Sequence, residues 1–255
     1  MKKILSILFT INLISINLYA LDLPNIDIQV GTGNSYRPFA YMNDETLQGY
    51  DVDVLRLLTL YDKGLNFHFH GVPWNAIFVG LESGKFNILA FQITKTPERE
   101  KKYIFSDYPY FNDVSAVITR KNQHIKSFNE LNGQVIGVSL GSNYALNLEK
   151  YLKNHPELSI RIKYYKNPPA LIADLGNNRI QAIIGEPISS VNIAKAQGIE
   201  LQATDIIIDK TPVFFVFHKD NMELKTRISQ ALKKAIDDGK LSDLSKKYFQ
   251  KDLTK

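Results

Sequence analysis

Apolar and polar residues alternate in several short stretches of the chain, and apolar residues at helical spacing fill the stretches between them. In the first third, alternation predicts strands at 26–33, 65–72 and 87–93. Helices are predicted between these strands, at 49–64 and 74–84, and each ends at a glycine. This β-α-β-α-β order favours a parallel sheet with crossover helices.

The same architecture recurs in the second third, without residue-by-residue similarity to the first. Predicted strands alternate there with helices, in the order 133–141, 144–154, 160–165, 168–178 and 179–186. Two further segments, 113–123 and 211–219, are extended, and a pair of helices at 224–239 and 240–249 ends the chain. The pattern therefore predicts two α/β units and two extended connections.

Two such units predict a two-lobed α/β fold, with parallel-rich sheets joined by two crossover strands. The first lobe is expected to contain residues 21–112 and 211–255, and the second lobe residues 113–210. The chain would cross between the lobes near 113–115 and 209–212. Because parallel strands end at one edge of their sheet, a ligand is expected in the cleft between the lobes.

The first 20 residues differ from the rest of the chain. Lys2 and Lys3 precede an apolar stretch, and Ala20 comes before the first acid, Asp22. This arrangement is typical of a cleavable secretory signal, which predicts a periplasmic protein. A retained membrane anchor is the alternative, but the stretch is short for a span and Asn12 interrupts it. With no cysteine in the chain, a lipoprotein anchor is excluded.

Composition and charge narrow the class further. The 255 residues are 44% hydrophobic and 22% charged, as in a soluble globular protein. Removal of residues 1–20 takes away two lysines and no acid, so the formal net charge falls from +5 to +3. That charge is small, and no basic cluster with interleaved aromatic residues occurs, so nucleic acid is not an expected partner. We expect a monomer.

The common catalytic motifs are missing from the sequence. It has no G-x-S-x-G, Walker loop, H-E-x-x-H or G-x-G-x-x-G, and no cysteine for thiol chemistry. His68 and His70 would share one strand face, but a polar strand face is the more common explanation than a metal pair. No catalytic residue, metal or cofactor is therefore predicted.

Two segments have the features of anion-binding sites. In "ITKTPER", Thr96 can cap a helix whose first turn holds Pro97 and Arg99. A cation in that turn is unfavourable unless an anion offsets it, although a structural salt bridge is an equally good explanation. In "GVSLGSNY", Ser142 or Asn143 can cap the next helix and leave an anion site at its N-terminus, although an ordinary cap is the more common case.

Five collinear stretches resemble the periplasmic solute-binding proteins that serve ABC transporters for polar amino acids. They are "GYDVDVLRLL", "ITKTPEREKKYIFSDYPYF", "GQVIGVSLGSN", "RIQAIIGE" and "DDGKLSDLSKKYF". The histidine-, glutamine- and arginine-binding proteins are familiar members of this family, which is solute-binding protein family 3. The resemblance implies the type II periplasmic binding protein fold, in which two lobes close on a free amino acid.

The resemblance also implies a set of ligand contacts. Carried over position by position, it implies that the ligand carboxylate is bound by Arg99 and Thr94, and from the second lobe by Ser142 and Asn143. The ligand ammonium would contact Gln92 and Glu186. Tyr36 and Trp74 would form aromatic walls around the ligand side chain, and Ser139 would be a side-chain contact that varies within the family.

Three positions depart from the family pattern and leave the ligand open. Glu186 is one methylene longer than the usual aspartate, and Gly33 stands where several binders of cationic amino acids carry an aspartate. Gln92 is larger than the usual glycine or serine, so its side chain either shrinks the pocket or contacts the ligand.

The predicted function is capture of a free amino acid and its delivery to an ABC-transporter membrane permease, without catalysis. One alternative is an enzyme similar to cyclohexadienyl dehydratases, which use this fold. Those enzymes carry a proton-donating acid where this chain has Ser189. The other alternative is an amino-acid sensor, which is usually fused to membrane or signalling segments that this sequence lacks.

Overall fold

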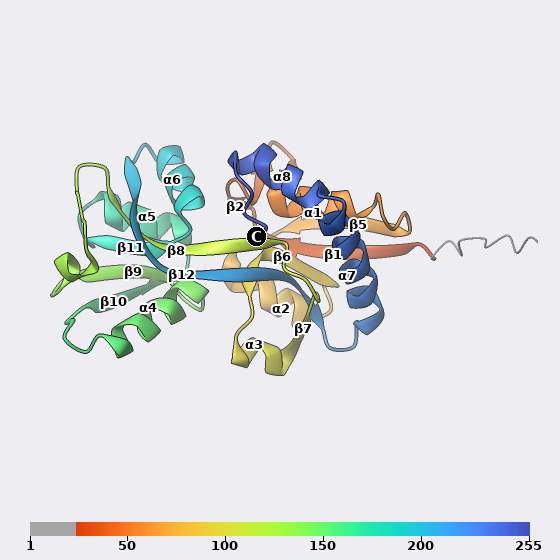
Figure 1. The fold of residues 1–255 in the computed structure, drawn as a ribbon, viewed down its shortest axis with the longest axis horizontal. Helices are drawn as coiled ribbons and strands as arrows, with labels where there is room; N and C mark the ends of the chain where they lie inside the picture. The colour runs from red at the N-terminus through yellow and green to blue at the C-terminus, as the bar shows by residue number, and fades with distance from the viewer. Residues whose placement is uncertain (1–23) are drawn as a thin grey trace, which may run out of the picture.

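The computed structural model describes residues 24–255, and the predicted signal segment, 1–20, lies outside them. Two groups of helices and strands are joined by two long strands that run side by side across the molecule (Figure 1). The predicted two-lobed α/β fold is therefore confirmed. Within residues 24–255, no helix combines the length and apolar character that a membrane crossing requires.

One nine-stranded sheet runs through both lobes of the described chain, in the order β10-β9-β11-β8-β12-β6-β1-β5, with β7 paired to β12. Its strands are β1 (Ile26–Thr32), β5 (Leu65–Gly71), β6 (Ile88–Thr94), β7 (Tyr103–Phe105), β8 (Phe111–Arg120), β9 (Val135–Ser139), β10 (Arg161–Tyr165), β11 (Ala182–Gly185) and β12 (Leu201–His218). The outer pairs, β1 with β5 and β6 and β9 with β10 and β11, are parallel. This parallel pairing agrees with the predicted β-α-β order.

The two central strands, β8 and β12, form the connection between the lobes. They are antiparallel, and Asp113 lies opposite Thr211 while Ser115 lies opposite Asp209. The two predicted crossing points are thus neighbours in one ladder. β12 begins ten residues before the predicted segment at 211, because its first half pairs with the end of β8. The lobe limits at 112/113 and 210/211 remain a prediction.

Helices cover both faces of the sheet in each lobe (Figure 1). They are α1 (Tyr50–Leu58), α2 (Ile77–Glu82), α3 (Pro97–Lys102), α4 (Asn143–Asn154), α5 (Pro168–Gly176), α6 (Pro187–Ala196), α7 (Met222–Asp237) and α8 (Lys240–Phe249), with short 3-10 turns at Trp74–Ala76 and Phe128–Leu131. β6 shows why both faces need cover. Ile88 packs toward α1 and α7, whereas Leu89 packs toward α2, so all seven residues of β6 are buried.

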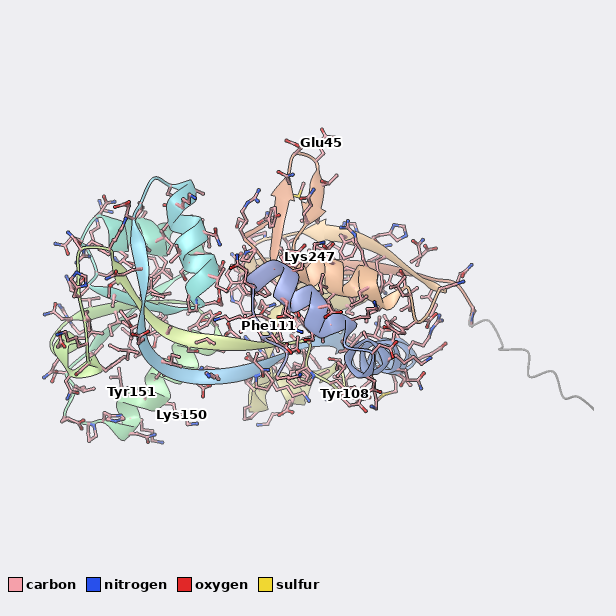
Figure 2. All side chains as sticks on the ribbon, turned by 45° about the horizontal axis from the view of Figure 1, so that its top comes forward. Glu45, Tyr108, Phe111, Lys150, Tyr151 and Lys247 are labelled. Atoms are coloured by element: carbon pink, nitrogen blue, oxygen red, sulfur yellow. The ribbon has the colours of Figure 1, made fainter. Side chains whose placement is uncertain are left out.

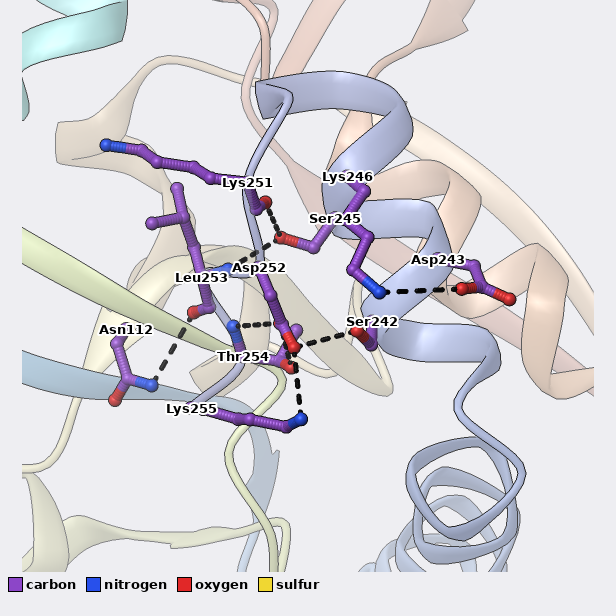
Figure 3. Close-up of polar contacts among 10 residues, drawn as sticks. All are labelled: Asn112, Ser242, Asp243, Ser245, Lys246, Lys251, Asp252, Leu253, Thr254 and Lys255. Carbon is purple, nitrogen blue, oxygen red and sulfur yellow. Dashed lines mark hydrogen bonds and ion pairs between the residues drawn. The ribbon is translucent and has the colours of Figure 1, made fainter.

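Two segments near the cleft were not predicted. Strands β2 (Ser35–Tyr36), β3 (Ala40–Asn43) and β4 (Thr46–Gln48) form a separate small sheet, which projects from the first lobe with Glu45 at its tip (Figure 2). The C-terminal residues return to the start of β8, where the Leu253 carbonyl accepts a hydrogen bond from the Asn112 backbone N–H at 2.8 Å. The Asn112 side-chain amide also donates to this carbonyl, at 3.5 Å (Figure 3). The Ser245 hydroxyl of α8 anchors the same tail by accepting from the Leu253 N–H at 2.9 Å.

Candidate ligand-binding cleft

Three hydrogen bonds join the lobes across the cleft within residues 24–255. The hydroxyls of Tyr36 and Tyr144 share a hydrogen bond of 3.1 Å. The indole N–H of Trp74 donates to the Leu140 carbonyl at 3.2 Å, and the Arg99 guanidinium donates to the Gly141 carbonyl at 2.8 Å. In each pair the first residue comes from the first lobe, and the second comes from α4 or the loop that precedes it. The lobes therefore lie in a closed arrangement.

Arg99 is the only buried residue of α3, a helix whose other residues are exposed. The Thr96 hydroxyl caps the helix by accepting from the Arg99 N–H at 3.2 Å, as the sequence predicts. One terminal guanidinium nitrogen donates to the carbonyl and hydroxyl of Thr94, at 3.0 and 3.3 Å. The guanidinium carbon lies 5.5 Å from the Trp74 ring centroid. The capped start of this short helix thus places the Arg99 side chain in the cleft.

The charge of Arg99 has no counter-ion among residues 24–255. Its partners there are the Thr94 hydroxyl and the carbonyls of Thr94 and Gly141, and it forms no ion pair with a carboxylate. Burial lowers the pKa of Arg99 to about 10, because the charged form loses water and the charge of the nearby Glu98 offsets only part of that loss. The sequence left two explanations for Arg99, a structural salt bridge and a bound anion. The described residues contain no salt bridge to Arg99. The site is suited to an anion.

The N-terminus of α4 faces Arg99 from the second lobe. The Ser142 hydroxyl caps this helix by accepting from the Ala145 N–H at 3.3 Å, and it also donates to the Ser139 carbonyl at 2.7 Å. Asn143 is the first helical residue, and its amide donates to the Asp113 carboxylate at 2.8 Å. Between the two predicted caps, the structure therefore selects Ser142.

A cavity of about 50 Å3 lies between the lobes beside these contacts. Its lining contains six of the predicted site residues and three others, namely Tyr36, Trp74, Gln92, Ser139, Ser142 and Asn143, with Phe91, Tyr144 and Pro168. Arg99 lines the neighbouring part of the cleft, and Ser142 borders both spaces. Thr94 stays in contact with Arg99. Eight of the nine predicted residues are thus grouped around one end of the cleft.

Glu186 is the ninth, and it lines an adjoining cavity of about 30 Å3. Tyr36 and Tyr144 border both cavities and stand between Glu186 and the space lined by Gln92. Glu186 caps α6, where its carboxylate accepts from the Ser189 N–H at 2.6 Å. Burial, and then the charge of Asp113, raise the pKa of Glu186 to about 8. A ligand that contacts both Arg99 and Glu186 must therefore displace the tyrosine pair.

Asp51 and Asp113 are buried acids that bond to residues of the cleft, a role that the sequence did not predict. Asp51, in the first turn of α1, is fully buried and accepts from the Gln92 amide at 2.6 Å. Its position four residues before Leu55, on the apolar stripe of α1, was the available signal. Asp113 accepts from Asn143 and from the Tyr144 hydroxyl, at 2.8 and 3.0 Å. Nothing in the local pattern around Asp113 indicated that role.

These buried carboxyl groups predict an unusual pH dependence of stability. Burial is the largest cause of each shift, and it raises the pKa of Asp51 to about 7, of Asp113 to about 6 and of Glu186 to about 8. At a pH between the ordinary pKa of each group and its raised pKa, the carboxyl is ionised in the unfolded chain but stays protonated in the folded protein. The free energy of unfolding of the ligand-free protein should therefore fall as the pH rises from about 5 to 8.

Urea unfolding at a series of pH values measures this slope. Glu186→Gln should flatten its upper part, near pH 8, whereas Glu200→Gln, at an exposed side chain, should leave the slope unchanged. A free energy of unfolding that rises across the whole interval would show that these carboxyl groups are ionised in the folded protein.

The histidine pair has ordinary protein partners. His68 lies 2.9 Å from the Asp27 carboxylate, and His70 lies 2.6 Å from the side-chain oxygen of Gln29. In the part of the chain that the structure describes, no three histidine, cysteine or acidic residues come together as a metal site would require.

Comparison with known proteins places this cleft in a family. The model of the bacterial extracellular solute-binding proteins, family 3, matches residues 28–251. The L-cystine-binding protein TcyA of Bacillus subtilis (strain 168) is 31% identical over 232 residues, which span 89% of this chain and 83% of TcyA.

Two solved structures have the same fold. The arginine-, lysine-, histidine-binding protein ArtJ from Geobacillus stearothermophilus has a TM-score of 0.75 and 28% identity, over 89% of this chain and 96% of ArtJ. The ancestral amino acid-binding protein AncCDT-1, a precursor of cyclohexadienyl dehydratase, has a TM-score of 0.73 and 26% identity, over 88% of this chain and 95% of that one. The chain therefore belongs to the bacterial extracellular solute-binding proteins of family 3.

Proposed function

We propose that this protein captures a free amino acid between its two lobes and delivers it to the membrane permease of an ABC importer. The observation that carries the proposal is Arg99, a buried cation with no carboxylate partner among residues 24–255. It faces the capped N-terminus of α4 across the cleft. The amino-acid-binding relatives support the proposal from an independent side.

The ligand carboxylate would replace the carbonyls that Arg99 now contacts. A guanidinium fork offers two parallel hydrogen bonds to a carboxylate, and these are stronger than its bonds to neutral carbonyls. The free N–H groups in the first turn of α4 would complete the anion site from the second lobe. Thr94 would add a hydroxyl donor, while Tyr36 and Trp74 would enclose the side chain.

The ligand ammonium would pair with Glu186 once the two tyrosines separate. A cation beside Glu186 favours its ionised form, which opposes the burial that now keeps its pKa high. Opening of the lobes about 113–115 and 209–212 would admit the ligand, because these residues are paired strand positions that both lobes share. Ligand binding would then shift the population toward the closed arrangement.

We propose that residues 1–20 are a cleaved signal, that the mature protein is not lipidated and that it acts as a monomer in the periplasm. The Lys2–Lys3 start and the absence of cysteine support the first two points. We also propose that it catalyses no reaction, because Ser189 stands where a dehydratase would need a proton-donating acid. Incubation with prephenate or arogenate should therefore leave both compounds unchanged.

A thermal-shift screen of the 20 amino acids and L-cystine tests the binding function. A ligand present at 100 times its dissociation constant stabilises the folded protein by about 2.7 kcal/mol, which raises the melting temperature by several degrees. We expect such a shift with one polar amino acid or a small group of them, and none with sugars or inorganic phosphate. A melting temperature that no amino acid changes at millimolar concentration would refute the proposal.

A further inference from the structure

Gln92 has an unusual backbone and lies in the wall of the ligand cavity. It is 5% exposed and sits near the end of β6, where its φ of 49° is in the left-handed region that non-glycine residues rarely adopt. Its N–H donates to the Tyr110 hydroxyl at 3.2 Å, outside the regular ladder. Strained residues of this kind persist where surrounding structure holds them, often at ligand sites.

The orientation of the Gln92 amide follows from its neighbour. Its nitrogen donates to the Asp51 carboxylate at 2.6 Å. Above about pH 7 Asp51 is ionised, and its carboxylate then accepts and does not donate, so the amide cannot rotate by 180° without losing this bond. The Gln92 amide oxygen is therefore held on the side of the amide that points away from the Asp51 carboxylate. It is buried, and it has no hydrogen-bond partner among residues 24–255.

We propose that the Gln92 side-chain oxygen accepts a hydrogen bond from an N–H group of the bound amino acid, and that Asp51 is the positioning residue that fixes this polarity. The inference rests on the proposed function for the presence of an amino acid in the cavity. The inference goes further than the proposed function because it states that the ligand group in contact with Gln92 is a hydrogen-bond donor. A buried acceptor without a partner is unfavourable, and a ligand N–H removes that cost.

The surrounding charges favour the same class of ligand. Asp51, Asp113 and Glu186 are all buried close to the cleft, and the charge of Asp113 raises the pKa of each of the other two. An acidic side chain at this end would face both these carboxylates and the Gln92 oxygen. The cavity should thus accept ligands with an amine, guanidinium, imidazole or amide and reject aspartate and glutamate. The N–H group comes from either the α-ammonium or the side chain.

Asp51→Asn tests the polarity directly, since an asparagine amide both donates and accepts and no longer holds Gln92 in one orientation. Gln92 can then present either its oxygen or its N–H group to the ligand. We expect the ratio of L-glutamate to L-glutamine affinity to rise roughly 10-fold to 100-fold, as for a hydrogen bond to a charged group. An unchanged ratio would refute the proposal.

Gln92→Met removes the amide while it keeps the length of the side chain. It should weaken the binding of L-arginine, L-histidine, L-glutamine and L-cystine, whereas Gln48→Met, in the exposed hairpin of the same lobe, should leave their binding unchanged. Comparing L-alanine with L-lactate identifies the source of the N–H. If Gln92→Met abolishes the preference for L-alanine over L-lactate, the α-ammonium is the donor. If Gln92→Met weakens only the binding of L-glutamine and L-arginine, the ligand side chain is the donor.

A ligand-free measurement separates this inference from the proposed function. In protein labelled with nitrogen-15, the Gln92 side-chain NH2 resonances should shift as Asp51 titrates, and this shift should vanish in Asp51→Asn. If no amino acid binds but the titration is seen, the proposed function fails while the assigned orientation stands. If the Gln92 resonances ignore Asp51, the inference fails whatever the ligand.

Discussion

Arg99→Ala should weaken amino-acid binding by about 2–5 kcal/mol, or roughly 30-fold to 5,000-fold. Without the guanidinium, the ligand carboxylate would be desolvated in the closed cleft and left with neutral donors only. Isothermal titration calorimetry with an amino acid that raises the melting temperature measures this loss. Lys101→Ala is the matched control, because Lys101 is an exposed cation on the same short helix. Near-native affinity in Arg99→Ala would mean that the carboxylate binds elsewhere.

The ligand-free Arg99→Ala protein should keep its stability. Arg99 is desolvated without a carboxylate partner in the described chain, so its removal relieves a cost and leaves no opposite charge unpaired. Its two carbonyl partners would have to be satisfied by water in the cleft. If the Arg99→Ala protein binds amino acids poorly yet unfolds at the same urea concentration as the wild type, Arg99 serves ligand binding and not the stability of the fold.

Arg227→Ala should show the opposite behaviour, with a loss of about 3–5 kcal/mol of stability. Arg227 on α7 donates twice to the Asp62 carboxylate, both times at 2.8 Å, and once to the Pro24 carbonyl. Both side chains of the pair are at least 93% buried. Truncation would leave Asp62 buried without its partner. Arg227 holds the pKa of Asp62 below its ordinary value, so this part of the stability is present above the unfolded pKa and is lost in acid.

Urea unfolding at neutral pH measures this effect. The double variant Asp62→Leu/Arg227→Met should recover much of the lost stability, because buried ion pairs can often be replaced by apolar residues of similar volume. Amino-acid affinity at a temperature where Arg227→Ala stays folded should be unchanged, since the pair lies away from the residues that line the cleft cavity. A double variant as unstable as the single one would show that the lost packing, rather than the unpaired charge, causes the loss.

The two arginines illustrate what local sequence can predict. The context of Arg99, with Thr96 and Pro97 before it, predicts a capped helix start, and the structure confirms the cap. The structure adds that Arg99 is buried. Arg227 sits in an ordinary amphipathic helix, and its partner Asp62 lies 165 residues away. No local pattern connects residues so far apart. A buried pair of this kind becomes visible only when α7 packs beside the end of α1.

The sequence by itself determined the order of most strands and helices and the two-lobed α/β class, because hydrophobic periodicity and helix caps are local properties of the chain. The family and the set of site residues followed from the resemblance of five collinear motifs to known proteins. The tertiary structure decided that Asp51 orients Gln92, that Tyr36 meets Tyr144 across the cleft and that Glu186 occupies an adjoining cavity. Contacts such as these join residues that are distant in sequence, and the packing of whole lobes sets their distances and burial.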